Sequence, residues 1–358
     1  MSQASEPSVA RRRAFALDAV GQSARSVVKA AWWTSAALLA RRIASPEKAR
    51  PASFDPKAPA APSRVVRRAW LAAFQKDAED IAAGLYPARN DAPKGLAVAF
   101  RRAADFLADA RLVEARRRRG GGVEAREDAP TSAAYPVYYR QNFHFQSGGW
   151  FTKDSAERYD AQVEALFSGT AGAMRRRVLS LLARHWKGRD HRNLAILDLA
   201  CGAGSFLGDL GATFPRARLL GLDLSPAYLV EAGRQNATVP LIQANVEKLP
   251  FADASLDAVV CIYLFHELPP KVRKTVAAEI GRILKPGGVF AFGDSVQPVD
   301  EPDLERLLEA FPAYFHEPFY ESYSTTDLNA LFALGDLVPI AQDKAFLTKA
   351  LLFERRRA

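Results

Sequence analysis

The chain has 358 residues, of which 49% are hydrophobic, and carries a formal net charge of +9 at pH 7. This length and composition predict a globular protein with one large or two ordinary domains. Its two cysteines, Cys201 and Cys261, lie far apart in apolar contexts. A disulfide framework and a cysteine-based zinc site are therefore disfavoured, and a reducing compartment is indicated. No apolar run reaches the roughly 18 residues that a membrane-spanning helix needs.

The positive charge is concentrated near the N-terminus. Residues 1–130 hold 24 Lys and Arg against 14 Asp and Glu, whereas the remainder is nearly neutral. Such a region can attract nucleic acid, acidic lipid or an acidic partner. However, Arg11–Arg13 and Arg116–Arg119 are not interleaved with aromatic residues as in a base-stacking platform. Nucleic acid is thus disfavoured as a partner. The basic side chains are expected either to be solvated without a partner or to make peripheral contact with an acidic surface.

The N-terminal 130 residues read as a basic helical domain with linkers. Residues 1–43 contain only two acids and suit either a packed helix or an organelle transit segment, and their apolar spacing favours the helix. Ser45–Ser63 carries five prolines and reads as a linker or ordered loop. The spacing of apolar residues predicts further helices over Arg64–Ile81 and Gly95–Val113. Arg116–Ala129, rich in Arg and Gly, is expected to be a flexible joint that contains a domain boundary.

Residues 131–154 form the next unit, which is dense in aromatic residues between Tyr135 and Phe151. Two interpretations are compatible: an arm that packs on the following domain, and a lid that supplies apolar walls to a binding site. Ser155–Trp186 then reads as a pair of helices, with Ser155 as a candidate cap of the first.

Leu194–Leu207 reads as a buried strand, a glycine turn and the start of a helix. Gly202 and Gly204 allow the backbone to approach a ligand closely and to point amide groups at it, which is typical of a nucleotide-type site. The dinucleotide fingerprint G-x-G-x-x-G is incomplete because Leu207 occupies its third position. An NAD site is therefore the weaker interpretation.

Further strands are expected after this turn. Arg218–Asp223 is a second buried strand that ends in an acid, and ligands collect at the carboxyl ends of strands in a doubly wound sheet. The third strand begins at Val239, the fourth at Ser255 and the fifth after Lys285, and the last pair is Val338–Gln342 and Ala345–Phe353. The short turn within that last pair requires the two strands to be antiparallel.

The motifs D-x-A-C-G-x-G, the acid at 223, L-P-F at 249–251 and L-K-P-G-G-x-F at 284–290 resemble those of class I S-adenosylmethionine (AdoMet) methyltransferases. The spacing is most similar to the ubiquinone/menaquinone C-methyltransferase branch. The resemblance implies an α/β Rossmann-like, doubly wound seven-stranded sheet with a C-terminal antiparallel hairpin over residues 155–358, and AdoMet as cofactor. Asn245 stands where the family usually has Asp. The cofactor-binding residues that the resemblance implies are Tyr159, Asp198, Ala200, Cys201, Gly202, Gly204, Asp223, Leu224, Asn245, Val246 and Tyr263.

The implied chemistry is methyl transfer to O, C or N of a small aromatic or lipophilic acceptor, without a metal. His266 and Asp294 are the candidate catalytic residues because they end strands near the expected methyl position; His266 as a general base and His266 as a structural or positioning residue both stay open. No N-P-P-Y signature is present and Cys261 lies mid-strand, so nucleic-acid methylation is disfavoured. The expected acceptor pocket comprises Tyr139, Phe143, His144, Trp150, His316 and Tyr320.

A second function class is a non-catalytic regulator or assembly factor that keeps the fold and binds a macromolecule through the basic N-terminal domain. The intact Gly202, Gly204 and Asp223 favour the enzyme. The expected location is cytoplasmic, or an organelle stroma or matrix if the N-terminus is a transit segment.

Overall fold

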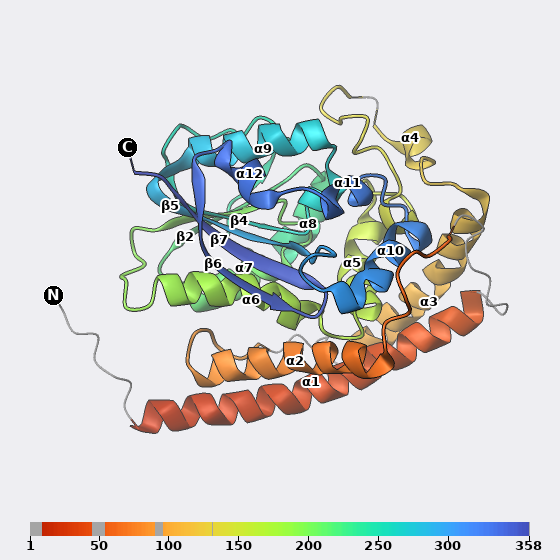
Figure 1. The fold of residues 1–358 in the computed structure, drawn as a ribbon, viewed down its shortest axis with the longest axis horizontal. Helices are drawn as coiled ribbons and strands as arrows, with labels where there is room; N and C mark the ends of the chain where they lie inside the picture. Colours follow the sequence, from red (N-terminus) through yellow and green to blue (C-terminus); the bar gives the residue numbers. More distant parts are fainter. Residues whose placement is uncertain (1–8, 45–53, 90–95, 131, 358) are drawn as a thin grey trace.

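The computed structural model describes residues 9–44, 54–89, 96–130 and 132–357 (Figure 1). Three long helices precede the sheet, and they confirm the three N-terminal helices predicted from apolar spacing. Residues 54–62, the described part of the proline-rich segment, contain neither helix nor strand, as expected for a linker or loop. The long helices are α1 (Val9–Ala44), α2 (Ser63–Ala82) and α3 (Leu96–Arg119).

The central sheet has seven strands in the order β3-β2-β1-β4-β5-β7-β6. Strands β1 to β5 run parallel to their neighbours, whereas β7 is antiparallel to both β5 and β6. This topology confirms the doubly wound sheet and its closing hairpin. The order reverses between β1 and β4, which is where open α/β sheets bind ligands. The strands are β1 (Ala195–Leu199), β2 (Arg218–Asp223), β3 (Leu241–Gln243), β4 (Leu256–Ile262), β5 (Leu284–Ser295), β6 (Leu337–Ala345) and β7 (Thr348–Arg355).

Helices cover both faces of the sheet (Figure 1). Because side chains alternate along a strand, Leu197 and Val259 pack against α9 and α12 on one face, while Ile196 and Val260 pack against α6 and α7 on the other. All four are fully buried, which explains why these strands read as continuous apolar runs. These helices and α8, which flanks β2 and β3, are α6 (Ala171–His185), α7 (Ser205–Thr213), α8 (Pro226–Gln235), α9 (Pro270–Ile283) and α12 (Leu328–Ala333).

Buried ion pairs join α2 to α6. Asp77 accepts two hydrogen bonds of 2.7 Å from the Arg176 guanidinium, and Arg177 Nη1 lies 2.7 Å from Asp80 Oδ2. The Tyr86 hydroxyl donates to Asp77 and accepts from Arg177. We call these five residues the α2–α6 cluster. It fixes the N-terminal helices against the layer that covers the sheet.

The α2 helix also contacts the edge strand β6, where Lys76 Nζ lies 2.5 Å from Asp343 Oδ1. The division of the chain at residue 130 stays a prediction.

The flexible joint expected over Arg116–Ala129 is wrong for its basic part, because α3 continues through Arg119. Arg116 and Arg119 both pair with Glu124, at 2.9 and 2.6 Å, and Arg116 donates to the Phe145 carbonyl oxygen. Arg116 and Arg119 thus share one carboxylate, and Arg116 ties the end of α3 to the aromatic segment.

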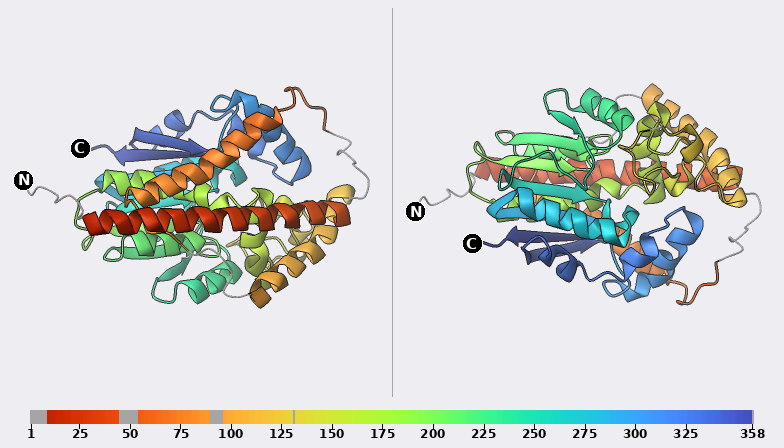
Figure 2. Two further views of the ribbon diagram at one scale, coloured as in Figure 1. Left: turned by 90° about the horizontal axis from the view of Figure 1, so that it is seen from below. Right: turned by 90° about the horizontal axis from the view of Figure 1, so that it is seen from above.

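The outward face of α1 is unusually apolar. Leu17, Val20, Val27, Val28 and Leu38 are each more than half exposed on it. In the left view of Figure 2, which shows the molecule of Figure 1 from below, this helix lies in front of the others. Even so, within the described ranges no helix is both long enough and apolar enough to cross a bilayer.

The remaining helices lie around the carboxyl edge of the sheet. Thr152, rather than Ser155, caps α5: its hydroxyl oxygen accepts from the Ser155 amide at 3.2 Å. Ser155 instead bonds the hydroxyl of Tyr228, so its polar atom serves a tertiary contact. These elements are α4 (Ala125–Asp128), η1 (Phe143–Phe145), α5 (Lys153–Leu166), η2 (Phe265–Glu267), η3 (Pro302–Leu304), α10 (Glu305–Tyr314) and α11 (Tyr320–Ser324).

Candidate active site

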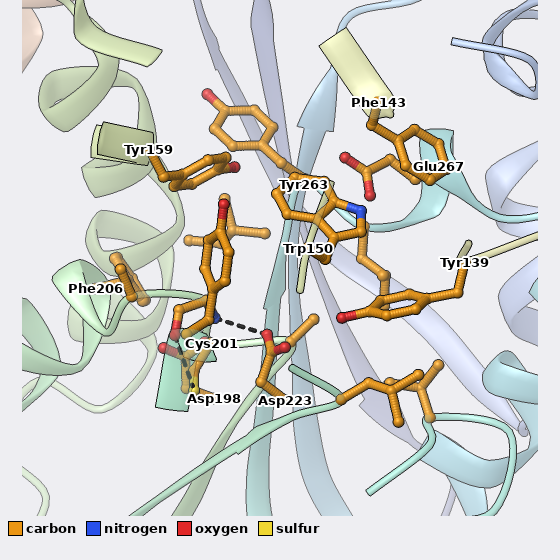
Figure 3. Close-up of a pocket in the computed structure, with 18 of the residues that line it drawn as sticks. Tyr139, Phe143, Trp150, Tyr159, Asp198, Cys201, Phe206, Asp223, Tyr263 and Glu267 are labelled. Atoms are coloured by element: carbon orange, nitrogen blue, oxygen red, sulfur yellow. Dashed lines mark hydrogen bonds between the residues drawn. The ribbon is translucent and has the colours of Figure 1, made fainter. Parts of the chain in front are cut away.

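A cavity opens at the carboxyl ends of β1, β2 and β4 (Figure 3). It holds about 1050 Å³ of space, including the part that is open to solvent. Of the predicted cofactor residues, all but Gly204 line it: Tyr159, Asp198, Ala200, Cys201, Gly202, Asp223, Leu224, Asn245, Val246 and Tyr263.

The glycine turn after β1 has two different glycines. Gly202 and Gly204 both have positive φ, at 54° and 83°. A Cβ atom on Gly202 would meet only Tyr228, at 4.0 Å, whereas one on Gly204 would lie 2.8 Å from Ala232 Cβ. Gly202 therefore leaves space for a ligand in the cavity, and Gly204 lets α7 pack against α8.

Asp223 at the end of β2 fixes the turn. Its carboxylate accepts from the Gly202 amide at 2.9 Å and from the Ser225 amide at 2.8 Å. Burial raises the pKa of this carboxyl, and the amide hydrogen bonds counteract part of that rise.

Asp198 lies beneath the turn and is 3% exposed. Its Oδ2 atom has no hydrogen-bond partner within the described part of the chain. Burial, together with the charge of Asp223, raises the pKa of Asp198 to about 8. A buried acceptor without a partner is costly, so this oxygen is suited to a donor group on a bound ligand.

The far end of the cavity is formed by Leu224, Asn245 and Val246. Asn245 Oδ1 accepts from the Glu247 amide at 2.9 Å, and the Tyr138 hydroxyl donates to the Glu247 carboxylate at 2.9 Å. These bonds hold the third-strand loop against the aromatic segment.

Aromatic side chains form one wall. Tyr139, Phe143 and Trp150, three of the residues assigned to the acceptor pocket from the sequence, line the cavity. Trp150 stacks edge-on against both Tyr159 and Tyr228, at 5.7 and 5.4 Å. The aromatic segment is thus a packed arm and a wall of the cavity at once, so both interpretations of the sequence describe it; its opening as a lid stays a prediction.

Five predicted residues, His144, His266, Asp294, His316 and Tyr320, do not line the cavity. His316 Nε2 lies 2.7 Å from Gln141 Oε1, and the Tyr320 hydroxyl lies 2.7 Å from the Ser295 hydroxyl. These two residues stabilise the surrounding shell. Their assigned roles, like those of the other site residues, stay predictions.

His144, His266 and Asp294 instead join two acids, Glu267 and Glu317, behind the aromatic wall. We call these five residues the His–carboxylate network. His266 Nδ1 lies 2.6 Å from Asp294 Oδ1, and His144 Nε2 lies 3.3 Å from Glu317 Oε1. Only Glu267 among the five lines the cavity. In the described residues no group of three such side chains is arranged to hold a metal ion.

The network contains unequal titrating groups. Burial disfavours the charged imidazolium of His266, but the adjacent Asp294 carboxylate outweighs this effect and raises the pKa to about 9. Burial and, to a smaller extent, the positive charges of His266 and His316 lower the pKa of His144 to about 3. Burial raises the pKa of Glu317 to about 8 and that of Glu267 well above its ordinary range.

Sequence reasoning missed several cavity residues. Arg175 lines the cavity from α6 and lies 3.6 Å from Asp160, but a single Arg on a helix carries no local signal of such a role. Glu267 had a signal, since it follows His266 at the end of the fourth strand. The other missed lining residues are Tyr138, Asp160, Ala203, Ser205, Phe206, Tyr228, Ile262, Leu264 and Leu268.

Comparison with known proteins gives consistent results. Residues 196–288 match the family model described as a methyltransferase domain. The chain is 30% identical over 198 residues to a ubiquinone/menaquinone biosynthesis C-methyltransferase of Desulfotalea psychrophila, which covers 51% of this chain and 76% of the relative. It is 34% identical to a demethylmenaquinone methyltransferase of Lactococcus lactis, over 35% of this chain and 50% of that protein.

A fatty-acid O-methyltransferase of Mycolicibacterium smegmatis is 33% identical, over 33% of this chain and 43% of its own length. The chain thus spans about half the length of the Lactococcus and Mycolicibacterium relatives. Among solved structures, the PH0226 protein of Pyrococcus horikoshii is 20% identical, with a TM-score of 0.39 over 57% of this chain and 95% of that one.

Proposed function

The chain belongs to the class I AdoMet-dependent methyltransferases, and on this premise we propose that it transfers a methyl group to a small aromatic or lipophilic acceptor. The observation that carries the proposal is the cavity at the carboxyl edge of the sheet. It brings the Gly202 turn, Asp198 and Asp223 together with an aromatic wall. No metal or second cofactor is needed, because the sulfonium of AdoMet supplies an already activated methyl group.

The lining residues fit this cofactor. The space in front of Gly202 accommodates the methionine part, and the unpartnered Oδ2 of Asp198 can accept from an ammonium group. Arg175 offers a cation for a carboxylate in the same cavity. Asp223 is suited to accept from ribose hydroxyls, and Asn245 and Val246 to bind an adenine edge.

The aromatic wall supports the acceptor class. Tyr139, Phe143, Trp150, Tyr159 and Tyr263 give the cavity large apolar surfaces, which bind rings or acyl chains and exclude water. Two relatives are named for quinone-precursor and fatty-acid methylation, which are both lipophilic acceptors. Holding two reactants in line in such a site can lower the barrier by ~7–11 kcal/mol.

The roles of His266 and Asp294 follow from their position behind the wall. The short contact between them holds the imidazole in one orientation beside Glu267. We assign them a positioning role in the acceptor site.

Calorimetric titration with AdoMet and S-adenosylhomocysteine tests the proposal. We expect micromolar binding by the wild type and at least about a tenfold loss in Gly202→Val, whose side chain would enter the cavity. Gly211→Ala is the matched control, because a Cβ there would lie 3.6 Å from Leu219, an ordinary contact. Labelled methyl transfer to quinones, phenols and fatty acids then identifies the acceptor.

Absence of binding by folded wild type would contradict the enzyme and favour the alternative, a regulator with this fold that binds a macromolecule through residues 1–130. The exposed apolar face of α1, flanked by exposed Arg25 and Arg42, supports peripheral contact with an acidic lipid surface in either case. Co-sedimentation with anionic but not zwitterionic vesicles is the expected result. The cytoplasmic location stays a prediction.

A further inference from the structure

Glu267 is the point where the His–carboxylate network meets the cavity. Its Oε1 atom lies 4.0 Å from Nε2 of His144 and also 4.0 Å from Nε2 of His266. The two histidines come from distant parts of the chain, the aromatic segment and η2, and converge on one oxygen. Glu267 is therefore flanked by two imidazoles, of which His266 holds an extra proton at neutral pH and His144 stays neutral.

Each histidine has an acid on its other side. Asp294, which is completely buried, contacts the Nδ1 atom of His266. Glu317 lies beside His144, and neither of its carboxylate oxygens makes a hydrogen bond to another described residue. A carboxylate buried in this way is strongly disfavoured unless it carries a proton or faces a positive charge. The network thus has room for a proton that its own contacts do not fix.

The charges that face Glu267 come from every element around it. Its charged neighbours are two imidazoles and several carboxylates, and the Arg175 guanidinium lines the same cavity. Burial, together with the carboxylates, outweighs the effect of His266, raises the pKa of Glu267 well above its ordinary range and favours its protonated form. The facing groups are His144 and Glu317 from the segments on the aromatic side, His266 from η2, Asp294 from β5, Asp223 from β2 and Tyr159 from α5.

We propose that Glu267 releases its proton when AdoMet binds and takes the proton of the acceptor when the methyl group is transferred. This inference rests on the proposed function, because it assigns the proton of that reaction to the Glu267 carboxyl group. The sulfonium brings one positive charge into a cavity of low dielectric, where it favours a carboxylate over a carboxylic acid.

The transfer then balances in atoms and charge. The bond between the methyl carbon and the sulfonium sulfur breaks, its electron pair stays on sulfur as a neutral thioether, and a bond forms between that carbon and the acceptor. The acceptor's proton passes to the Glu267 carboxylate. One positive and one negative charge are lost together, so the transfer leaves the net charge of the buried site unchanged.

Proton-linked calorimetry tests the inference without knowledge of the acceptor. AdoMet and S-adenosylhomocysteine are titrated into the full chain at pH 7.5 in phosphate and in Tris, which differ in ionisation enthalpy. We expect about one proton to be released with AdoMet and about one fewer with S-adenosylhomocysteine, which lacks the sulfonium charge. Both ligands carry the same ammonium group, so any proton released by Asp198 cancels in the difference.

The variants assign the proton. Glu267→Gln is expected to bind both ligands but to abolish the difference in proton release, and Glu267→Asp to restore part of it. Glu247→Gln, which removes a carboxylate near the other end of the cavity, is the matched control and should keep the full difference. Circular dichroism confirms that each variant is folded.

Equal proton release with the two ligands, or a difference that persists in Glu267→Gln, would overturn the inference while leaving the cofactor site intact. If folded wild type binds neither ligand, the proposed function itself fails, so the two failures are distinguishable.

Discussion

Two clusters of buried charge serve opposite purposes in this molecule. In the α2–α6 cluster, two carboxylates meet two guanidinium groups, and every carboxylate oxygen has a hydrogen-bond or ion-pair partner. In the His–carboxylate network, three carboxylates meet two imidazoles, and Glu317 faces the neutral ring of His144 rather than a guanidinium group. The first cluster is balanced in charge, whereas the second is not.

The difference separates structural from functional charge. A balanced cluster whose carboxylate oxygens are all paired gains nothing from a ligand, so its interactions contribute to folding alone. An unbalanced cluster is tolerated because the surrounding fold is stable enough. It is stabilised when a cation or a proton binds. Opposite responses to the same kind of substitution follow from this contrast.

The largest expected effect comes from the balanced cluster. Asp77→Leu leaves the Arg176 guanidinium buried without its main partner, and we expect the free energy of unfolding to fall by about 3–5 kcal/mol. Urea denaturation measures the change. Arg184→Met is the control, since Arg184 pairs with Asp80 but its side chain is 59% exposed, and less than about 1 kcal/mol is expected. Equal stability of Asp77→Leu and wild type would refute the structural role.

The next effect is a difference in pH dependence. Burial opposes ionisation of Asp77, but Arg176 and Arg177 outweigh it and lower its pKa below the ordinary 3.8, so this stabilisation holds above that pH and is lost in acid. The His266 pKa is raised to about 9, so its stabilisation is complete below pH 6.5 and is lost as pH rises through 9. Burial raises the pKa of Glu317 from 4.5 to about 8, so its carboxyl group lowers the stability further as the pH rises from 4.5 to 8.

The free energy of unfolding of the ligand-free protein should therefore fall between pH 6 and pH 9, by up to about 1.4 kcal/mol per pH unit for each of these groups. Thermal unfolding should show this as a melting temperature that decreases over the same interval. The profile of Glu317→Gln should be flatter. A melting temperature that rises over this interval would contradict the proton assignment in the His–carboxylate network.

A smaller effect of opposite sign is expected from Glu317→Met. This substitution replaces a buried, unbonded carboxyl group by an apolar chain of similar length, and we expect stability at pH 8.5 to increase by about 1–3 kcal/mol. Denaturant midpoints of the two proteins measure it. Destabilisation comparable to that of Asp77→Leu would mean that the two clusters do not differ in kind.

The smallest effect should come from His316→Gln. His316 bonds Gln141 and lies outside the network, so removal of its ring should change stability by less than about 1 kcal/mol. The AdoMet-linked proton release should also be unchanged. A loss of proton release in this variant would extend the network beyond the five residues that define it.

The strands and the glycine turn were predictable because their signals are local. The apolar run before Asp198 and the glycines after it determine a strand and a turn within a few residues. The pairing of Glu317 with His144, in contrast, joins segments far apart in sequence, and no periodicity reports it. Likewise Arg176 and Arg177 read as the polar face of a helix. In the structure Arg176 is buried and pairs with Asp77, which is 99 residues away in the sequence.

The same separation explains one error and the limit of one prediction. The arginine run of α3 resembles a flexible joint until its partner Glu124 is placed beside it. The sequence leaves open whether His266 is a base or a positioning residue, and in the structure the short turn η2 directs its neighbour Glu267 to the cavity. Which of two adjacent side chains faces a cavity depends on one backbone turn, which sequence patterns do not resolve.

The contact between α2 and β6 has a consequence for the order of events during synthesis. Lys76 leaves the ribosome 267 residues before its partner Asp343. At 5–20 residues per second, that interval lasts roughly 10–50 s. During it α2 can already pack on α6, but its contact with the edge strand cannot form. The closing hairpin is therefore the last part of the chain to join the N-terminal helices to the sheet.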